Sequence, residues 1–406
     1  MNKFKYFFIL LIASTALVSC NKNDDNDDIT VEPLRDYGTQ YKTDNDNIED
    51  YLKTYSITVI NSPGNQEDQD VTITKITDPA NQPSIMSYLN SPTFPKLLTR
   101  NVNLYGVDYK MYYLVLREGT GTSPMNTDGV LAAYKGEYLT RVEATTTEPV
   151  VPAHLTTTLF EEIKFPQADK NLVDLYRAVV GWAEIFPQFK TGTSTAQTDG
   201  TIKHENFGAG VMFIPSGLGY YTGYNSIPAY RPLIFSFKLY DVQRLDHDGD
   251  QILDINEDLN SDGYIYDYRS TTLYPNPPVN PDDTDKDGIP DFIDIDDDGD
   301  GYATRLEITK PAGEVGGNFG PSSYYPFEAF TVLDDPSTPY INEALNSEDK
   351  GIPAFLRTVL VPDPTDPTGV KKITVNEYDY TTAGRLKIHL DKDHNTTKVT
   401  TVTAKR

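Results

Sequence analysis

The sequence predicts a protein of the α+β class, and three observations point to it. Short runs of apolar residues alternate with a period of two, as half-buried strands do, and in the run 233–242 one face is wholly apolar. One short apolar helix is expected at 180–186, where Pro187 ends it. The residues between that helix and that strand are mostly Gly, Pro, Ser and Tyr, which predicts a loop that positions aromatic rings. The residues of the apolar face are Leu233, Phe235, Phe237 and Leu239.

Earlier in the chain, apolar residues at helical spacing predict a helix over 47–55, with Asn47 as its cap. Alternating β-branched and aromatic residues predict strands at 71–76 and 109–116. A further strand follows Asp128. Its expected inward face is Val130, Ala132 and Tyr134.

Two segments beside these strands lack any period, 140–158 and 191–206, and we interpret both as polar insertions. The region 308–362 is rich in Gly, Pro and Tyr and predicts no clear element. Beyond it, 371–378 and 385–390 are expected to be strands of a small C-terminal β element.

The charge is strongly acidic and unevenly distributed. Across 406 residues, 60 Asp and Glu face 35 Lys and Arg, a net charge of −25. Residues 241–300 alone hold 19 acidic and 3 basic residues, or −16. Such a segment repels nucleic acid and attracts cations, so nucleic acid is excluded as a partner. The five His have no catalytic or metal-binding partner at a recognisable spacing, and no phosphate-binding Gly loop is present.

The first residues have the pattern of an export signal. Lys3 and Lys5 precede an apolar run, 7–17, that is short for a membrane span. The run ends in Leu-Val-Ser-Cys, which resembles the bacterial lipobox cut before the cysteine. That resemblance implies diacylation of Cys20, a membrane anchor through lipid, and an outer-membrane lipoprotein facing the periplasm or the surface. The alternative is an ordinary secretory signal with a chance cysteine. Because Cys20 is the only cysteine, no disulfide forms within the chain.

After Val242 the acidic residues recur two apart around glycines, a spacing that lets a tight loop direct oxygens onto a hard cation. The loop 296–307 matches every position of an EF-hand loop, whereas 246–257 has Gln251 in place of the glycine. The tandem string resembles thrombospondin type 3 repeats, which implies several structural Ca²⁺ ions that stiffen a linker. The candidate ligands are Asp246, Asp248, Asp250, Asp254, Glu257, Asp258, Asn260, Asp262, Asp283, Asp285, Asp287, Asp291, Asp294, Asp296, Asp298, Asp300, Thr304 and Glu307.

A series of motifs over 109–242 resembles the FKBP-type peptidyl-prolyl isomerases. In order they are Gly119-x-Gly121 after a strand, Val130-x-x-x-Tyr134-x-Gly136, Phe160-Glu161, Val179-x-Gly181-Trp182-x-Glu184, Ile214-Pro215-x-x-Leu218-x-Tyr220, Ile227-Pro228, and Leu233-x-Phe235-x-x-x-Leu239-x-x-Val242. The resemblance covers about a third of the chain. It implies a twisted antiparallel sheet wrapped around one short helix, followed here by the irregular repeats and a small β-rich C-terminal region.

The resemblance also implies a substrate pocket. Trp182 forms its floor under a substrate proline ring, and the Val179 N–H and the Tyr220 hydroxyl bind substrate carbonyls. Glu161 stands where the family usually has Asp, and the apolar residue before the helix is either Leu172 or Val173. The pocket residues carried over are Tyr134, Phe160, Glu161, Val179, Trp182, Tyr220, Ile227 and Phe235.

Rotation about an X-Pro amide needs no acid, base or cofactor, because an apolar pocket favours the less polar twisted amide. Two functions follow from the sequence. The chain is an exported prolyl isomerase acting on proline-containing segments of exported proteins, or it is a non-catalytic, calcium-stabilised module that binds proteins. The expected domains are a signal peptide (1–19), an acidic tether (20–45), an N-terminal extension (46–100), an isomerase domain (101–245), calcium-binding repeats (246–307) and a C-terminal region (308–406). Within the tether, 21–28 is either a signal for export to the outer surface or a solvated spacer.

Overall fold

The computed structural model describes residues 33–168, 170–310, 315, 322–325, 355–377 and 386–392. The chain divides into two compact units, Met1–Arg35 and Asp36–Arg406, and the second contains every element discussed below. The signal peptide, Cys20 and the segment 21–28 lie outside the described residues. Among the described helices, none combines the length and the apolar composition needed to cross a membrane.

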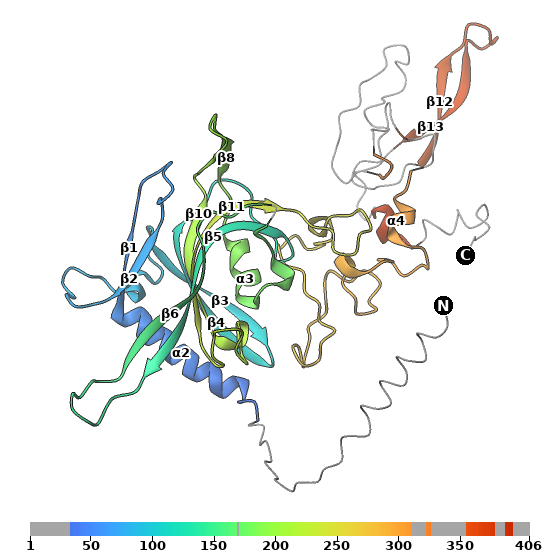
Figure 1. The fold of residues 1–406 in the computed structure, drawn as a ribbon. Coiled ribbons are helices and arrows are strands. Elements are labelled where there is room, and N and C mark those ends of the chain that lie inside the picture. Colours follow the sequence, from blue (N-terminus) through green and yellow to red (C-terminus); the bar gives the residue numbers. More distant parts are fainter. Residues whose placement is uncertain are drawn as a thin grey trace, which may run out of the picture. The chain divides into compact units, whose positions relative to one another are not determined.

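The central element is a seven-stranded antiparallel sheet, which confirms the mixed helix-and-sheet class. Its strand order is β3-β4-β10-β11-β5-β6, and β7 also pairs with β5. The sheet curls around the short helix α3 (Figure 1). The bounds are β3 Lys96–Leu104, β4 Val107–Arg117, β5 Gly129–Val142, β6 His154–Ile163, β7 Leu172–Asp174, β10 Gly208–Ile214, β11 Leu233–Gln243 and α3 Val180–Ile185.

Both faces of this sheet are covered, and each has its own apolar core. Along β11, the predicted face of Leu233, Phe235, Phe237 and Leu239 belongs to the core around α3. Ile234 and Tyr240 point the other way, into a core shared with helix α2. Because neighbours bury both sides, β11 contains few polar residues in spite of its strand periodicity.

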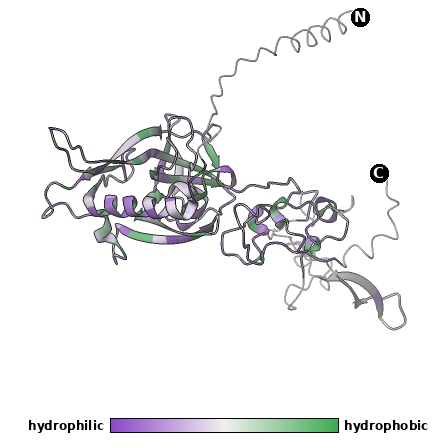
Figure 2. Ribbon diagram, turned by 90° about the horizontal axis from the view of Figure 1, so that it is seen from below, coloured by the Kyte–Doolittle hydropathy of each residue, from purple (hydrophilic) through white to green (hydrophobic). Residues whose placement is uncertain are grey.

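Helix α2, Tyr37–Thr54, covers the second face and begins ten residues before the predicted start at Asn47. Its N-cap is Asp36, whose Oδ1 accepts a hydrogen bond from the Thr39 N–H at 2.8 Å. The predicted start was missed because the first turns are mostly polar, with Tyr37 and Tyr41 as their only large aromatic or apolar side chains. Ile48, Tyr51 and Leu52 are buried as expected. Figure 2 shows that the side of α2 seen there is largely hydrophilic.

The N-terminal extension adds a small hairpin. β1, Tyr55–Val59, pairs antiparallel with β2, Val71–Lys75, which confirms the strand expected at 71–76. Tyr55, expected to close the helix, is instead the first residue of β1. A 3-10 turn at Ile85–Tyr88 leads into the main sheet.

Three segments expected to be loops or insertions contain strands. Residues 208–214 form β10, a fully buried strand between β4 and β11, because its glycines allow neighbouring backbone and the Phe189 ring to approach closely. The expected insertion 140–158 is shorter, since β5 continues to Val142 and β6 begins at His154. The insertion 191–206 is a hairpin of β8, Thr193–Ala196, and β9, Ile202–Glu205.

Beyond β11, the acidic segment 246–307 is irregular. It contains 3-10 turns at Asp254–Asn256 and Asp291–Ile293 and ends in the short helix α4, Thr304–Glu307. The C-terminal hairpin pairs β12, Phe355–Pro362, with β13, Val370–Glu377, which agrees with the strand predicted at 371–378 as far as it is described. The strand predicted at 385–390 was wrong, because Ile388–Leu390 is a 3-10 turn. Residue 378, the last of the strand predicted at 371–378, and residue 385, the first of the strand predicted at 385–390, lie outside the described residues.

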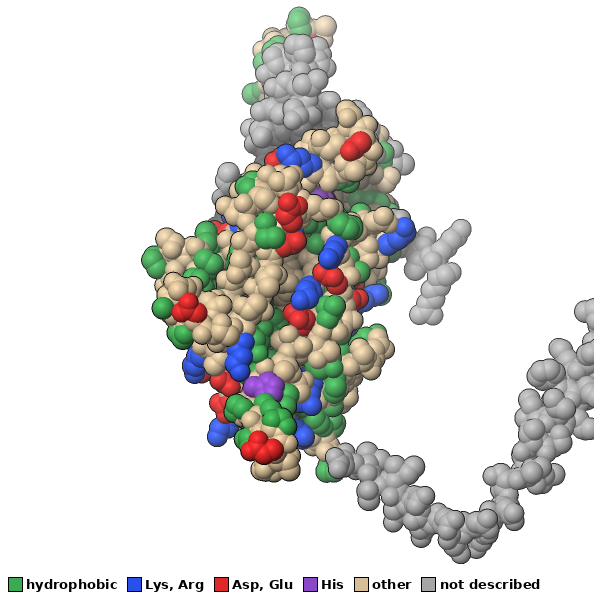
Figure 3. All heavy atoms as spheres, turned by 60° about the vertical axis from the view of Figure 1, so that its left-hand side comes forward, with side chains coloured by type: hydrophobic (Ala, Val, Ile, Leu, Met, Phe, Trp, Pro, Cys, Tyr) green, Lys and Arg blue, Asp and Glu red, His purple; other side chains and the backbone are tan. Residues whose placement is uncertain are grey.

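Positive and negative side chains are interspersed on the molecular face that Figure 3 displays. Several surface charges are paired, for example Arg141 with Asp50 at 3.2 Å and Lys203 with Glu205 at 2.9 Å. Exposed pairs of this kind add little to stability and chiefly keep the surface hydrated.

Candidate functional site

The only tryptophan sits on α3, inside the curl of the sheet. The helix approaches β10 closely at Gly181, where an added Cβ would lie 2.7 Å from Ile214. Trp182 follows directly, is only 4% exposed, and has a buried indole Nε1 with no hydrogen-bond acceptor among the described residues. The indole therefore presents an apolar surface whose one polar atom has no partner.

Aromatic rings from three strands surround this indole. Tyr134 of β5 lies 4.9 Å from the Trp182 ring centroid at 86°, and Phe235 of β11 lies 5.1 Å away at 85°. Phe160 of β6 packs edge-on against Phe235 at 5.5 Å. Gly136 makes this packing possible, since a Cβ there would lie 2.6 Å from Phe160 and 2.7 Å from Phe235. Edge-to-face pairs of this kind hold each ring in one orientation.

The remaining predicted residues flank the same cluster. Val179 is the N-cap of α3, and its carbonyl accepts a hydrogen bond from the Trp182 N–H at 2.8 Å. Ile227 is 5% exposed, and Val179 and Tyr220 are half-buried; all three pack with the Trp182 core. Of the two candidates for the apolar residue before the helix, Val173 on β7 also packs against that core.

Glu161 lies at the exposed edge of this cluster. Burial raises the pKa of Tyr134, and the nearby Glu161 carboxylate raises it further. Burial and then the charge of Glu161 also raise the pKa of Tyr220. The Glu161 carboxylate therefore lies near the hydroxyl groups of both Tyr134 and Tyr220. All eight residues carried over from the sequence thus lie in or beside one aromatic cluster, which we call the Trp182 cluster.

The opposite side of α3 is held by residues that the sequence analysis missed. Arg100 of β3 donates from Nε to Glu184 Oε2 at 2.6 Å, and Tyr266 donates its hydroxyl to Glu184 Oε1 at 3.0 Å. Tyr264 donates its hydroxyl to the Glu184 carbonyl at 3.0 Å, and the Arg100 guanidinium stacks on its ring at 3.8 Å. The spacing of Tyr264, Tyr266 and Tyr268 was the available signal, because alternate residues point to one side of an extended chain.

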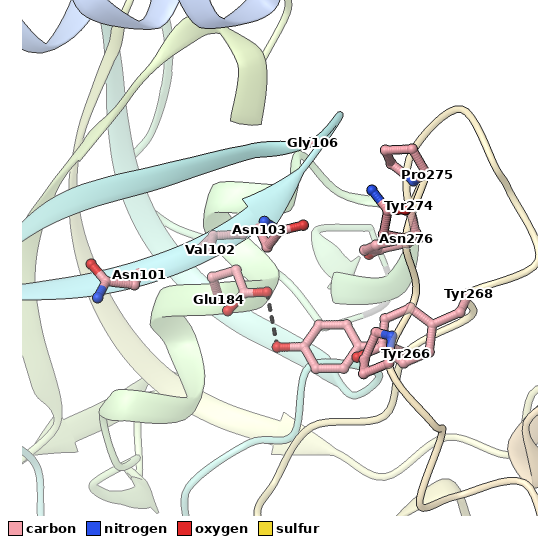
Figure 4. Close-up of a pocket in the computed structure, with 11 residues that line it drawn as sticks. Asn101, Val102, Asn103, Gly106, Glu184, Tyr266, Tyr268, Tyr274, Pro275 and Asn276 are labelled. Carbon is pink, nitrogen blue, oxygen red and sulfur yellow. Dashed lines mark hydrogen bonds between the residues drawn. The ribbon is translucent and has the colours of Figure 1, made fainter.

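Beside this ion pair lies a cavity of about 410 Å³, shown in Figure 4. It is lined by Asn101 and Asn103 on β3, by Glu184 on α3, and by Tyr266, Tyr268 and Tyr274 from the segment after β11. The carboxylate of Glu184 points toward Tyr266 across one wall. The cavity is separate from the Trp182 cluster, although the same helix contributes to both.

The acidic segment contains three separate groups of carboxyl groups. Within each group, one oxygen from every residue lies within 4.8 Å of the others. Two of them, Asp283/Asp285/Asp287 and Asp296/Asp298/Asp300, come from single loops that the sequence predicted. The third joins Asp248, Asp250 and Glu257 to Asp297, which was not predicted because it occupies an intervening position of its own loop. Loops of this composition suit Ca²⁺, a hard cation that takes oxygen ligands.

Several predicted ligands are engaged in other ways. Asp254 accepts hydrogen bonds from the His247 N–H at 3.1 Å and lies 2.6 Å from its Nδ1. Asp291 accepts from Thr284, and Thr304 accepts from the Asp297 N–H. The carboxylates predicted as ligands but outside the three groups are Asp246, Asp254, Asp258, Asp262, Asp291, Asp294 and Glu307, and the Asn260 amide oxygen accepts from the Asp262 N–H.

Burial and mutual repulsion shift the protonation of this segment. Burial first and then the charge of Asp250 raise the pKa of Asp248 to about 8. Burial and the neighbouring carboxylates raise the pKa of Asp297 to about 10 and that of Glu257 well above its ordinary value. Such shifts occur where like charges are packed without a counterion.

A family model matches most of the acidic segment and the residues that follow it. Residues 247–340 match the model described as BamM C-terminal. Among curated proteins, no match was found.

Solved structures similar to this chain include isomerases. One is a peptidyl-prolyl cis-trans isomerase from Pseudomonas syringae pv. tomato, 20% identical, covering 33% of this chain and 76% of that one, with a TM-score of 0.23. FkpA from Escherichia coli is 23% identical and covers 33% of this chain and 48% of that one, with a TM-score of 0.23. The N-terminal domain of FKBP42 from Arabidopsis thaliana is 13% identical and covers 36% of this chain and 94% of that one, also with a TM-score of 0.23.

Proposed function

We propose that this protein is an FKBP-type prolyl cis–trans isomerase that assists the folding of exported proteins. The observation that carries the proposal is the perpendicular packing of Tyr134 and Phe235 around Trp182, on residues whose motifs resemble that family. The cluster offers a rigid aromatic surface of the kind that packs against a proline ring. Its floor carries no acid, base or nucleophile, and amide rotation needs none.

The reaction is a rotation, so catalysis depends on what the site binds best. The barrier to rotation about an X-Pro bond is about 20 kcal/mol, and the planar amide is more polar than the twisted one. The apolar surface of Trp182 and Phe235 favours the twisted amide over the planar one, which lowers the barrier. The Val179 N–H and the Tyr220 hydroxyl orient the substrate by binding its carbonyls.

Cis–trans exchange of an X-Pro peptide, followed by NMR with the full-length protein in detergent, tests this function. Acceleration over the uncatalysed exchange, both with calcium and with chelator, supports an isomerase whose calcium sites are structural. Absence of acceleration, from protein whose fold is verified by circular dichroism, would falsify the isomerase proposal. The module would then bind proteins without catalysis, a function favoured by the low exposure of Trp182 and by the contacts of Glu161.

We also propose that the acidic loops bind structural Ca²⁺ and that lipid on Cys20 anchors the chain to the outer membrane. The three carboxylate groups support calcium binding, and the BamM C-terminal match of residues 247–340 favours the outer membrane as the location. The partners are proline-containing segments of exported proteins. Mass spectrometry of the protein purified from membranes tests the anchor, since diacylation adds a defined mass at Cys20.

A further inference from the structure

One of the three carboxylate groups is built from two loops that lie far apart in the sequence. Asp248, Asp250 and Glu257 come from the first acidic loop, and Asp297 comes from the last, 40 residues after Glu257. One oxygen from each lies within 4.8 Å of the others. Oxygens that share one Ca²⁺ at about 2.3–2.6 Å lie at most about 5 Å apart, so these four fit around a single ion.

Five carboxyl oxygens in this group are buried and have no hydrogen-bond partner among the described residues. Asp297 is 1% exposed and neither of its carboxylate oxygens has a hydrogen-bond partner. Glu257, also 1% exposed, has no partner for Oε1, and one oxygen of Asp250 and one of Asp248 likewise have none. Buried carboxyl oxygens without a partner are costly, and ionised carboxylates this close together repel one another. A cation at the centre of the group gives these oxygens a partner and neutralises their charge.

Two basic side chains lie near this group. Lys387 donates to the Asn256 carbonyl at 2.8 Å, and the His389 Nε2 is 4.0 Å from Asp297 Oδ2. The His389 ring thus lies at the outer limit of an ion-pair contact with Asp297.

The group also departs from an EF-hand arrangement. Asp246 accepts hydrogen bonds from the Gly249 and Gln251 N–H groups, and Asp254 is held by His247. The first and ninth positions of the first loop are thus occupied by contacts within that loop. Asp297, from the last loop, brings a fourth carboxylate to the group instead.

We infer that Asp248, Asp250, Glu257 and Asp297 bind one Ca²⁺ that joins the first acidic loop to the last. The inference rests on the proposed calcium binding and is independent of isomerase activity. The ion closes the chain between 257 and 297, so it stabilises the compact arrangement of the whole segment, whereas an ion within one loop stabilises only that loop.

Calcium titration of the full-length protein in detergent, by calorimetry after chelator treatment, tests this site. Asp297→Asn and Glu257→Gln are each expected to remove, or weaken by more than about tenfold, the binding of one ion, since carboxylate ligands set calcium affinity. The double variant should lose the same single ion. Asp287→Asn is the matched control, because it belongs to a separate group; combined with Asp297→Asn it should affect two ions.

Thermal unfolding separates a ligand from a merely structural side chain. In chelator, Asp297→Asn is expected to raise the Tm, because a neutral amide replaces a buried carboxyl group that lies among three others; in calcium it is expected to lower the Tm. Unchanged calcium binding by Asp297→Asn, a lower Tm in both conditions, or loss of two ions from the double variant with Glu257→Gln would each overturn the shared site. Absence of any calcium binding by the wild type would overturn calcium binding as well, while prolyl exchange measured in chelator would still decide the isomerase.

Discussion

The Arg100 guanidinium lies 2.6 Å from the Glu184 carboxylate, and this ion pair connects strand β3 to the helix that carries Trp182. Glu184 is two residues from Trp182 and is almost completely buried. Burial raises the pKa of Glu184, and Arg100 opposes that shift. The pair, together with Tyr266, fixes the position of α3 and therefore of the floor of the proposed pocket.

Glu184→Gln tests this connection. The neutral amide weakens the charge-assisted hydrogen bond and leaves Arg100 without a counterion, so the free energy of unfolding is expected to fall by about 2 kcal/mol. Urea unfolding followed by the fluorescence of Trp182 measures it. Glu162→Gln is the control, because among the described residues the Glu162 carboxylate forms an exposed pair with Lys164 at 3.6 Å, and it should change stability by less than about 0.5 kcal/mol. Equal effects of the two variants would contradict the role of Glu184.

Tyr220→Phe tests the proposed carbonyl-binding hydroxyl. The phenyl ring keeps its packing beside Trp182, so stability should hardly change. The rate of prolyl exchange is expected to fall about fivefold, as loss of one hydrogen bond of about 1 kcal/mol in the transition state predicts. NMR exchange on an X-Pro peptide measures this rate. Tyr224→Phe is the matched control, since Tyr224 stacks on Tyr220 at 4.9 Å but has no proposed contact with substrate. A full rate in Tyr220→Phe would exclude the hydroxyl from catalysis.

Asp44→Ala tests how helix α2 is fixed to the sheet domain. Asp44 Oδ2 accepts hydrogen bonds from the Ser216 N–H at 2.8 Å and the Ser216 hydroxyl at 2.6 Å, in the turn that precedes Tyr220. Removing the acceptor leaves both buried donors unsatisfied, which should cost about 2–3 kcal/mol. Denaturant unfolding measures the loss. Asp46→Ala on the exposed side of the same helix should be nearly neutral, and a similar loss there would point to helix propensity as the cause.

The same residue predicts a pH dependence. Burial raises the pKa of Asp44 above its ordinary value, although Ser216, Gln40 and the charge of Arg231 oppose the shift. The native state therefore holds this proton more tightly than the unfolded chain does. Its contribution to stability is complete below about pH 4 and is lost as the pH rises through the folded-state pKa.

Asp44→Asn removes that titration. The stability of the wild type minus that of Asp44→Asn is expected to decrease between pH 4 and pH 7, and the acidic loops cancel in the difference because both proteins contain them. Urea unfolding at each pH, in chelator, provides the measurement. A difference that grows with pH would mean that the folded state favours the ionised carboxylate.

Much of the architecture was readable from local pattern. The alternation in 109–116 and 233–242 predicted β4 and β11, and the apolar turn before Pro187 predicted α3. Local pattern did not predict the structure of segments that form strands only because neighbouring strands pair with them. The first three residues of β10, Gly-Ala-Gly, have weak intrinsic strand preference, and they join the strand because β4 and β11 pair with it on both sides.

Among the candidate site residues too, those in local motifs were predicted, and those that depend on contacts between distant segments were missed. The aromatic residues of the Trp182 cluster were identified through motifs, and the strands bring them together. The Arg100–Glu184 pair was missed, because its partners are 84 residues apart and no motif includes Arg100, although Glu184 ends the motif that contains Trp182. Asp297 was missed because an intervening position in a calcium-type loop is expected to face solvent.

The sequence by itself determined the α+β class, the position of the central helix, the aromatic residues around Trp182 and the concentration of acid after Val242, because each depends on residue type and short-range spacing. Only the tertiary structure decided which side of α3 is fixed by Arg100 and Tyr266, and which carboxylates meet. Those contacts join residues separated by tens of positions, and their geometry depends on how the strands and loops pack together.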